Sequence, residues 1–146
     1  MLADKLQLRV ITPNAIKLDK KIDFVIMRST TGEMGFLPGH EGRSYNLEFC
    51  TMRIFAGGAE RMMAVHGGLA EIKKNEVIVL TPAAEWPDDI DKAQAEESVK
   101  EAERKLQGKS DIMEAYAHAE ALRRAQVRLD VCQFAQSGDA EWDEAV

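Results

Sequence analysis

Apolar and polar residues alternate in the first part of the chain. The alternation covers residues 6–10, and it returns at residues 22–26 with Ile22, Phe24 and Ile26 as its apolar members. A period of two is typical of a strand that buries one face. Both segments are therefore predicted to be strands whose apolar residues point into a core.

Further strand-like segments lie next to glycine pairs. Residues 47–55 precede the glycines at 57–58, and residues 61–65 precede the glycines at 67–68. We interpret both pairs as turns, because glycine adopts backbone angles that other residues reach only with strain. Strands and turns at this spacing are typical of an antiparallel sandwich.

The clearest hairpin lies around the polar turn at residues 74–75. Across this turn Ala70 and Ile72 are predicted to face Val77 and Val79. The first part of the chain is therefore predicted to be an antiparallel β-sandwich.

The hydrophobic period changes after Pro87. Asp88 or Asp89 can cap a helix, in which apolar residues recur every three or four positions and form one stripe. The stripe consists of Ala95, Val99, Ala102 and Leu106, and Gly108 ends the helix.

A second helix is predicted to start after a cap at Ser110 or Asp111. Its seam has Ala115, Leu122 and Leu129 at intervals of seven, widened by Ile112, Tyr116 and Ala119. The two helices form a predicted hairpin. Because its seam is rich in alanine, it buries little area at about 25 cal/mol per Å², and we expect the hairpin to be weakly held and able to open.

Charge divides the chain in the same way. Residues 1–86 hold eleven basic and ten acidic groups, whereas residues 87–146 hold eight basic and fifteen acidic groups. We therefore predict a sandwich domain at 1–86, a helical hairpin at 87–135 and an acidic, disordered tail at 136–146. Trp142 is either an anchor for a contact or an aromatic residue in a mobile tail. The net charge of −6 argues against nucleic-acid binding.

No catalytic set is visible in the sequence. The three histidines lie in different contexts, and no serine or cysteine stands in a nucleophile motif such as G-x-S-x-G. Cys50 and Cys132 lack the spacing of a zinc site, so we expect neither catalytic nor metal-binding residues. No apolar stretch approaches the roughly 20 residues of a membrane-spanning helix, and the N-terminus lacks a signal-peptide pattern, so we expect a cytoplasmic protein.

The segment Gly32–His40 combines glycines, a proline and apolar residues, and we interpret it as a loop shaped for docking. The apolar side chains of Met34, Phe36 and Leu37 require a partner surface that covers them, which the segment alone does not identify. His40 is expected to form structural hydrogen bonds within the loop rather than to act as an acid or base.

Arg124 and Arg128 are four residues apart and share one face of the second helix, with Arg123 beside them. One interpretation is a solvated face that pairs with Glu120. The other is an anion-binding stripe, for nucleotide phosphates or an acidic protein segment, because arginine forks match planar oxyanions. The residues alone leave both open.

Three segments together carry a resemblance to a known family: Gly32–His40, Val65–Leu80 and Ala84–Ala95. In order and spacing they resemble the ε subunit of bacterial F-type ATP synthase. The resemblance implies a β-sandwich followed by a helical hairpin, with no enzymatic activity of its own. It also implies a peripheral place at the cytoplasmic face of the inner membrane, on the central rotor. The partners would be the γ subunit and the ring of c subunits.

The resemblance also assigns roles to residues. The docking loop matches the segment that faces the rotor, with Glu33 at its exposed turn and His40 at its end. In the family the hairpin can extend along γ towards the catalytic α and β subunits, where its basic residues meet an acidic segment and brake ATP hydrolysis. Arg123, Arg124 and Arg128 are the matching candidates.

Some family members bind ATP as a regulatory ligand in the folded hairpin. This chain resembles their motif at Glu85, Ile90 and Asp91, and on the second helix at Arg124 and Arg128. It departs from the motif at residue 94, three positions after Asp91, where glutamine replaces arginine. Loss of this charge weakens the expected nucleotide affinity, and no cofactor is required for the other roles.

Two alternatives belong to other classes of protein. One is a free-standing ATP sensor whose hairpin closes on the nucleotide. The other is an adaptor domain whose hairpin binds an acidic partner.

Overall fold

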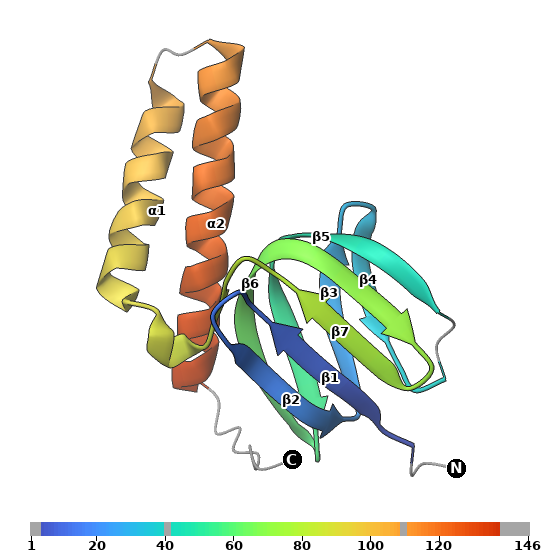
Figure 1. Ribbon diagram of the computed structural model, residues 1–146. Helices are drawn as coiled ribbons and strands as arrows, with labels where there is room; N and C mark the ends of the chain where they lie inside the picture. The colour runs from blue at the N-terminus through green and yellow to red at the C-terminus, as the bar shows by residue number, and fades with distance from the viewer. Residues whose placement is uncertain (1–3, 40–41, 109–110, 138–146) are drawn as a thin grey trace.

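The computed structural model describes residues 4–39, 42–108 and 111–137; for residues 136 and 137 it describes the backbone alone. The predictions for His40, Ser110, Trp142 and the tail beyond 137 lie outside the described residues. The described chain forms a β-sandwich followed by two helices, as Figure 1 shows. The predicted fold class is therefore confirmed.

The sandwich is built from one sheet that folds over on itself. Its strands are β1 (Leu6–Ile11), β2 (Ile16–Ile22), β3 (Phe24–Ser29), β4 (Gly32–Phe36), β5 (Arg43–Ala56), β6 (Ala59–Lys73), β7 (Glu76–Leu80) and β8 (Ala84–Glu85). The order is β2-β1-β7-β6-β5-β3-β4, and β8 pairs with β6. All pairs are antiparallel except β1 with β7, which is parallel.

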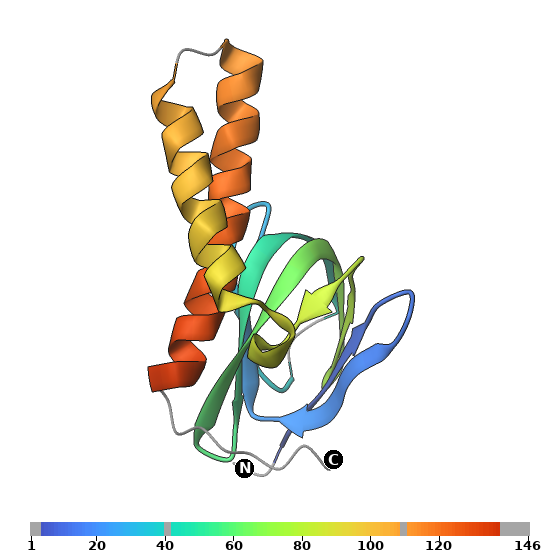
Figure 2. The same cartoon turned by 90° about the vertical axis from the view of Figure 1, so that its left-hand side faces the viewer.

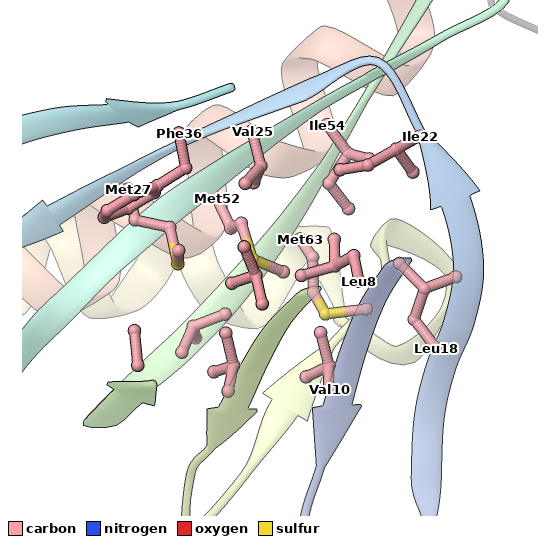
Figure 3. Close-up of a cluster of buried hydrophobic side chains, with 14 of the residues drawn as sticks. Leu8, Val10, Leu18, Ile22, Val25, Met27, Phe36, Met52, Ile54 and Met63 are labelled. Atoms are coloured by element: carbon pink, nitrogen blue, oxygen red, sulfur yellow. The ribbon is translucent and has the colours of Figure 1, made fainter. Parts of the chain in front are cut away.

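The core lies between the two layers of this sheet. Figure 3 shows side chains of β1 and β2 on one side facing side chains of β3, β4 and β5 on the other. Leu6, Leu8 and Val10 are fully buried, which confirms the alternation predicted for residues 6–10. The hairpin around residues 74–75 is also confirmed, with Ala70 opposite Val79.

The inward face of β3 is the opposite of the one predicted. Val25 and Met27 point into the core, whereas Phe24 and Ile26 are only partly buried and lie on the other face. The prediction treated residues 22–26 as one strand, but β2 ends at Ile22 and β3 begins after one intervening residue. One inserted residue at the corner exchanges the two faces of a strand, because side chains alternate with a period of two.

The glycines at 67–68 lie inside β6 and do not form the turn predicted for them. The strand runs through them, pairing with β8 at Val65 and with β7 from Leu69 onward. Both have positive φ, and a Cβ atom on Gly68 would lie 2.0 Å from the carbonyl oxygen of Leu80. Glycine is required here because β7 approaches the backbone too closely for a side chain.

The first part of the segment Gly32–His40 is a strand, where a loop was predicted. Residues 32–36 form β4, which pairs with β3 from Ser29 opposite Gly32 to Val25 opposite Phe36. Gly32 takes φ of 130° at the turn into β4. The glycines therefore start a hairpin, and the exposed loop is limited to the residues that follow Phe36.

The helical part consists of a short 3-10 helix η1 (Pro87–Asp89), α1 (Lys92–Gln107) and α2 (Ile112–Ser137). Asp91, not the predicted Asp88 or Asp89, caps α1 and accepts a hydrogen bond from the backbone N of Gln94 at 3.1 Å. The chain is extended at Ile90, which separates η1 from α1. Gly108 ends α1, and Asp111 caps α2, both as predicted.

Helices α1 and α2 pack side by side and project beyond the sandwich, as Figures 1 and 2 show. Their shared apolar cluster consists of Ala95, Val99, Ala125 and Leu129, with Ile90 and Leu122 packed against it. The prediction that Ile112 and Tyr116 widen the seam is wrong, because they are 87% and 69% exposed. They lie near the tip, where no second layer covers the helices.

Candidate functional site

The end of α2 that follows the hairpin seam packs against β5 and β6 of the sandwich, as Figure 1 shows. Val131 of α2 is fully buried, and Phe49 of β5 is 8% exposed. Phe49 points away from the sandwich core, because Met52 and Ile54 of the same strand occupy the inward phase. The outer face of the sheet therefore offers one aromatic side chain to α2.

Phe49 contacts all three arginines that the sequence placed on α2. The guanidinium carbons of Arg124 and Arg128 lie 5.6 Å and 5.8 Å from the centre of its ring, within the range of cation–π attraction. Arg123 donates a hydrogen bond from Nη1 to the backbone carbonyl of Phe49. The ring of His66 on β6 lies 4.3 Å from the ring of Phe49. The arginines are thus attached to the sandwich.

Glu85 provides an ionic contact between the sandwich and α2. Arg128 donates from Nε to Glu85 Oε1 at 2.9 Å, and Nε2 of His66 lies 2.5 Å from the same oxygen. The side chain of Glu85 is 21% exposed, so this pair is partly shielded from water. A partly shielded pair is less screened by salt than a pair on the open surface.

Arg123 has a second partner on its own helix. Its Nη2 lies 3.0 Å from Oε2 of Glu120, and this hydrogen bond raises the pKa of Arg123 and lowers the pKa of Glu120. Of the two interpretations of the arginines, pairing with Glu120 therefore holds for Arg123. Arg128 instead pairs with Glu85, across the boundary between the two parts of the chain.

Four residues of the predicted ATP site come together beside η1. Glu85, Ile90, Asp91 and Arg128 line a pocket of about 300 Å³ together with Gln94. Arg124, the fifth predicted residue, lies over the ring of Phe49 and is not part of this lining. The pocket can accept a small polar ligand, but its single arginine already pairs with a carboxylate, which disfavours an added anion.

The predicted partner-binding residues at the end of β4 have different surroundings. Glu33 is exposed and Leu37 is 59% exposed, whereas Met34 is partly buried and packs against the core. Phe36 is 1% exposed and belongs to the core, so it supports this segment from inside and offers no surface to a partner. Gly39 is held by a hydrogen bond of 2.8 Å from its N–H to Asn75 Oδ1.

Two family models cover nearly the whole described chain. Residues 5–87 match the β-sandwich domain of the ATP synthase delta/epsilon chain, and residues 88–133 match its long α-helix domain. The chain belongs to this family. The resemblance to ε subunits noted from the sequence is thereby confirmed.

Relatives within the family are similar over most of their length. An ATP synthase epsilon chain from Caldicellulosiruptor saccharolyticus is 35% identical, over 91% of this chain and 97% of the relative. An ATP synthase epsilon chain from a Cyanothece species is 41% identical, over 85% and 92%.

A solved structure has the same fold at lower sequence identity. It belongs to a cryo-EM structure of the mitochondrial ATP synthase of Euglena gracilis that contains OSCP, F1 and the c-ring. The TM-score is 0.76 at 22% identity, over 91% of this chain and 84% of that chain.

Sequence reasoning missed Phe49 and a groove next to it. The groove has a volume of about 670 Å³ between the hairpin and the outer faces of β3 and β5, and Phe49, Arg53, Leu122 and Val127 are among its lining residues. The available signal was an aromatic residue on the outward face of a strand whose next outward residues, Thr51 and Arg53, are polar. No spacing rule connects it to α2.

None of the helices described here is long and apolar enough to cross a membrane. Among the residues that the structure covers, no group of three histidine, cysteine, aspartate or glutamate side chains is placed to hold a metal ion.

Proposed function

We propose that this chain is an ε-type rotor subunit that couples a γ subunit to a ring of c subunits and restrains ATP hydrolysis through α2. The observation that carries the proposal is the attachment of three α2 arginines to the sandwich through Phe49 and Glu85. These contacts are polar and partly exposed, so they can be exchanged for contacts with another acidic surface. The subunit itself carries out no chemistry.

The coupling surface is placed at the turn and the exposed end of β4. Glu33 and Leu37 are accessible there, on a segment whose backbone is fixed by pairing with β3 and by the bond from Gly39 to Asn75. A rigid backbone with an exposed apolar side chain suits a stable contact, because little order must be gained on binding. Leu37→Asp should weaken assembly, whereas Ile16→Asp, which charges an exposed residue on β2, should not.

The brake is assigned to Arg123, Arg124 and Arg128. If they pair with an acidic segment of the catalytic α and β subunits, replacing Arg124 and Arg128 by alanine should raise the ATPase activity of the assembled complex. High salt should reproduce part of the effect, since exposed charge pairs are screened. Unchanged activity in the double variant would remove the brake from these arginines.

The placement is tested by mixing the chain with the γ subunit of the same organism. Co-purification with γ, and a lower ATPase activity of the core complex when the chain is added, are the expected results. A chain that stays monomeric, binds nucleotide tightly and ignores γ would contradict the proposal and favour a free-standing ATP sensor. The complex is expected at the cytoplasmic face of the membrane, with the chain in a peripheral position.

ATP as a regulatory ligand is a second candidate, because Glu85, Ile90, Asp91 and Arg128 share one pocket. The pair between Glu85 and Arg128 and the neutral Gln94 favour weak binding. Gln94→Arg should strengthen binding, since a charge-assisted hydrogen bond contributes roughly 1.5–3 kcal/mol. Titration calorimetry with ATP measures both forms, and micromolar affinity in the unaltered chain would contradict the expected weakness.

A further inference from the structure

Glu85 lies at the point where the chain leaves the sheet, and strand pairing fixes its backbone. Glu85 is the second residue of the two-residue strand β8 and pairs with Ala64 of β6. The chain then continues through η1 to the helices. A carboxylate at this place is held by the sandwich while it faces the returning helix α2, which approaches from 43 residues further along the chain.

Glu85 and Phe49 divide the guanidinium groups of α2 between them. Arg128 has both the carboxylate of Glu85 and the ring of Phe49, Arg124 has the ring, and Arg123 has the carbonyl of Phe49. The aromatic ring and the carboxylate are also joined through His66, which contacts each of them. Within the described residues, each of the three arginines thus has at least one partner on the sandwich.

We propose that Glu85 and Phe49 form a clasp that holds the hairpin on the sandwich by occupying the same arginines that act on a partner. Glu85 takes the place of a partner's carboxylate, so the docked hairpin cannot offer Arg128 to an acidic surface. The hairpin leaves the sandwich only when this internal pair is broken. The clasp rests on the geometry of the chain alone, and its consequence for the brake rests on the proposed function.

The clasp also ranks the ligands that open it. An oxyanion that reaches Arg128 competes with Glu85 for one guanidinium group, whereas a neutral ligand of the same size does not. The adjoining pocket contains Asp91 as well as Glu85, so the electrostatic field favours the internal pair over a free anion. Opening is therefore assigned to an acidic protein surface, which can contact several arginines together.

The first test measures docking of the hairpin in the full, isolated chain. Spin labels at Asn14→Cys and Glu97→Cys, two exposed positions on the sandwich and on α1, report the distance between the two parts when Cys50 and Cys132 are replaced by alanine. The unaltered clasp should give one distance population. Glu85→Gln should add a second, longer population, with the docked-to-undocked ratio falling about fivefold, as expected for loss of a partly exposed ion pair.

Glu60→Gln is the matched control. Glu60 pairs with Arg53 at 2.7 Å, but both residues lie in the sandwich, so breaking this pair should leave the distance population unchanged. Phe49→Leu, which keeps an apolar side chain but removes the ring, should also increase the undocked population. Combining Glu85→Gln with Arg128→Gln should add little to Arg128→Gln alone, because that single change already removes the pair with Glu85 as well as the contact with the ring of Phe49.

A single unchanged distance population in Glu85→Gln and in Phe49→Leu would overturn the clasp. Equal opening in Glu60→Gln would overturn it as well, since the effect would then be general. The ATPase activity of the assembled complex separates the clasp from the brake: Glu85→Gln should deepen inhibition by freeing the arginines. Opening of the hairpin with no change in inhibition would support the clasp and contradict the proposed brake.

Discussion

The two parts of this chain are held together by different kinds of contact. The sandwich core contains large aliphatic side chains with at most 1% of their surface exposed, such as Leu8, Met52 and Ile72. The shared cluster of the hairpin consists of two alanines, one valine and one leucine, and the tip leaves Ile112, Met113 and Tyr116 exposed. The stabilisation from burial scales with area, so the sandwich closes on itself, while the hairpin depends on the packing of α2 against β5 and β6 and on the contacts of its three arginines. A stable half and a releasable half follow from side-chain size.

The largest effect is expected from Gly68→Ala in β6. A Cβ atom would lie 2.0 Å from the carbonyl oxygen of Leu80, and φ is +113°, so the sheet must shift and the free energy of unfolding should fall by about 3 kcal/mol or more. Gly58→Ala is the control. Its φ of +81° is unfavourable for a side chain, but an added Cβ atom would have no atom within 4 Å apart from those of the residue itself and its chain neighbours. It should cost about 1 kcal/mol. Urea unfolding measures both, and equal losses would show that the close approach does not matter.

The next largest effects come from leucine-to-alanine substitutions, one in the sandwich core and one in the hairpin cluster. Leu8→Ala in the sandwich should lower the free energy of unfolding by about 4 kcal/mol, because the residue is fully buried among large neighbours. Leu129→Ala in the hairpin cluster should cost about 2 kcal/mol and should act mainly on the helices. Hydrogen exchange locates each loss. Faster exchange throughout the sandwich in Leu129→Ala would contradict the separation of the two parts.

Removing the hairpin altogether should have a smaller effect on the sandwich. Truncation after Trp86 keeps the tryptophan that packs against the sandwich core. It removes the cover of the outer face near Phe49 and the ion pair between Asp89 of η1 and Lys17 of β2. We expect a cooperative unfolding transition with a free energy lowered by about 1–2 kcal/mol. Denaturant unfolding and dye binding check this. A molten, dye-binding product would make the hairpin part of the core.

The smallest effect concerns the corner between β2 and β3. The hydrogen bond from Lys5 lowers the pKa of Asp23, and a further hydrogen bond of 2.9 Å from the N–H of Gly57 acts in the same direction. The lowered pKa contributes stability that is fully present above the unfolded value of about 3.9 and is lost as pH falls through the folded value. Asp23→Asn should cost about 0.5 kcal/mol at pH 7, because both side chains of the pair with Lys5 are partly exposed to water, which screens the interaction.

Stability curves of the unaltered chain and Asp23→Asn between pH 7 and pH 2 provide the measurement. The difference between them should shrink as the carboxylate of Asp23 becomes protonated. A difference that stays constant over this range would assign the effect to the shape of the side chain instead of its charge.

Local patterns determined the type and order of the elements. Alternation over residues 6–10, the turn at residues 74–75 and the caps at Gly108 and Asp111 each depend on a few neighbouring residues, and all are present in the structure. The candidate ATP residues Glu85, Ile90 and Asp91 were also found from a short motif, and the structure brings them into one pocket. Signals of this kind survive because the backbone geometry that they specify is local.

The tertiary structure decided which faces meet. The inward face of β3 differs from the predicted one because one residue lies between β2 and β3 at the corner. The glycines at 67–68 allow β7 to approach the backbone of β6 closely, which no rule for turns predicts. The clasp joins Phe49 of β5 and Glu85 of β8 to Arg128 of α2, residues whose proximity depends on the order of the strands and the path of the hairpin. Side-chain chemistry and spacing are written in the sequence, but contacts between distant segments arise only when sheet register and helix packing bring their surfaces together.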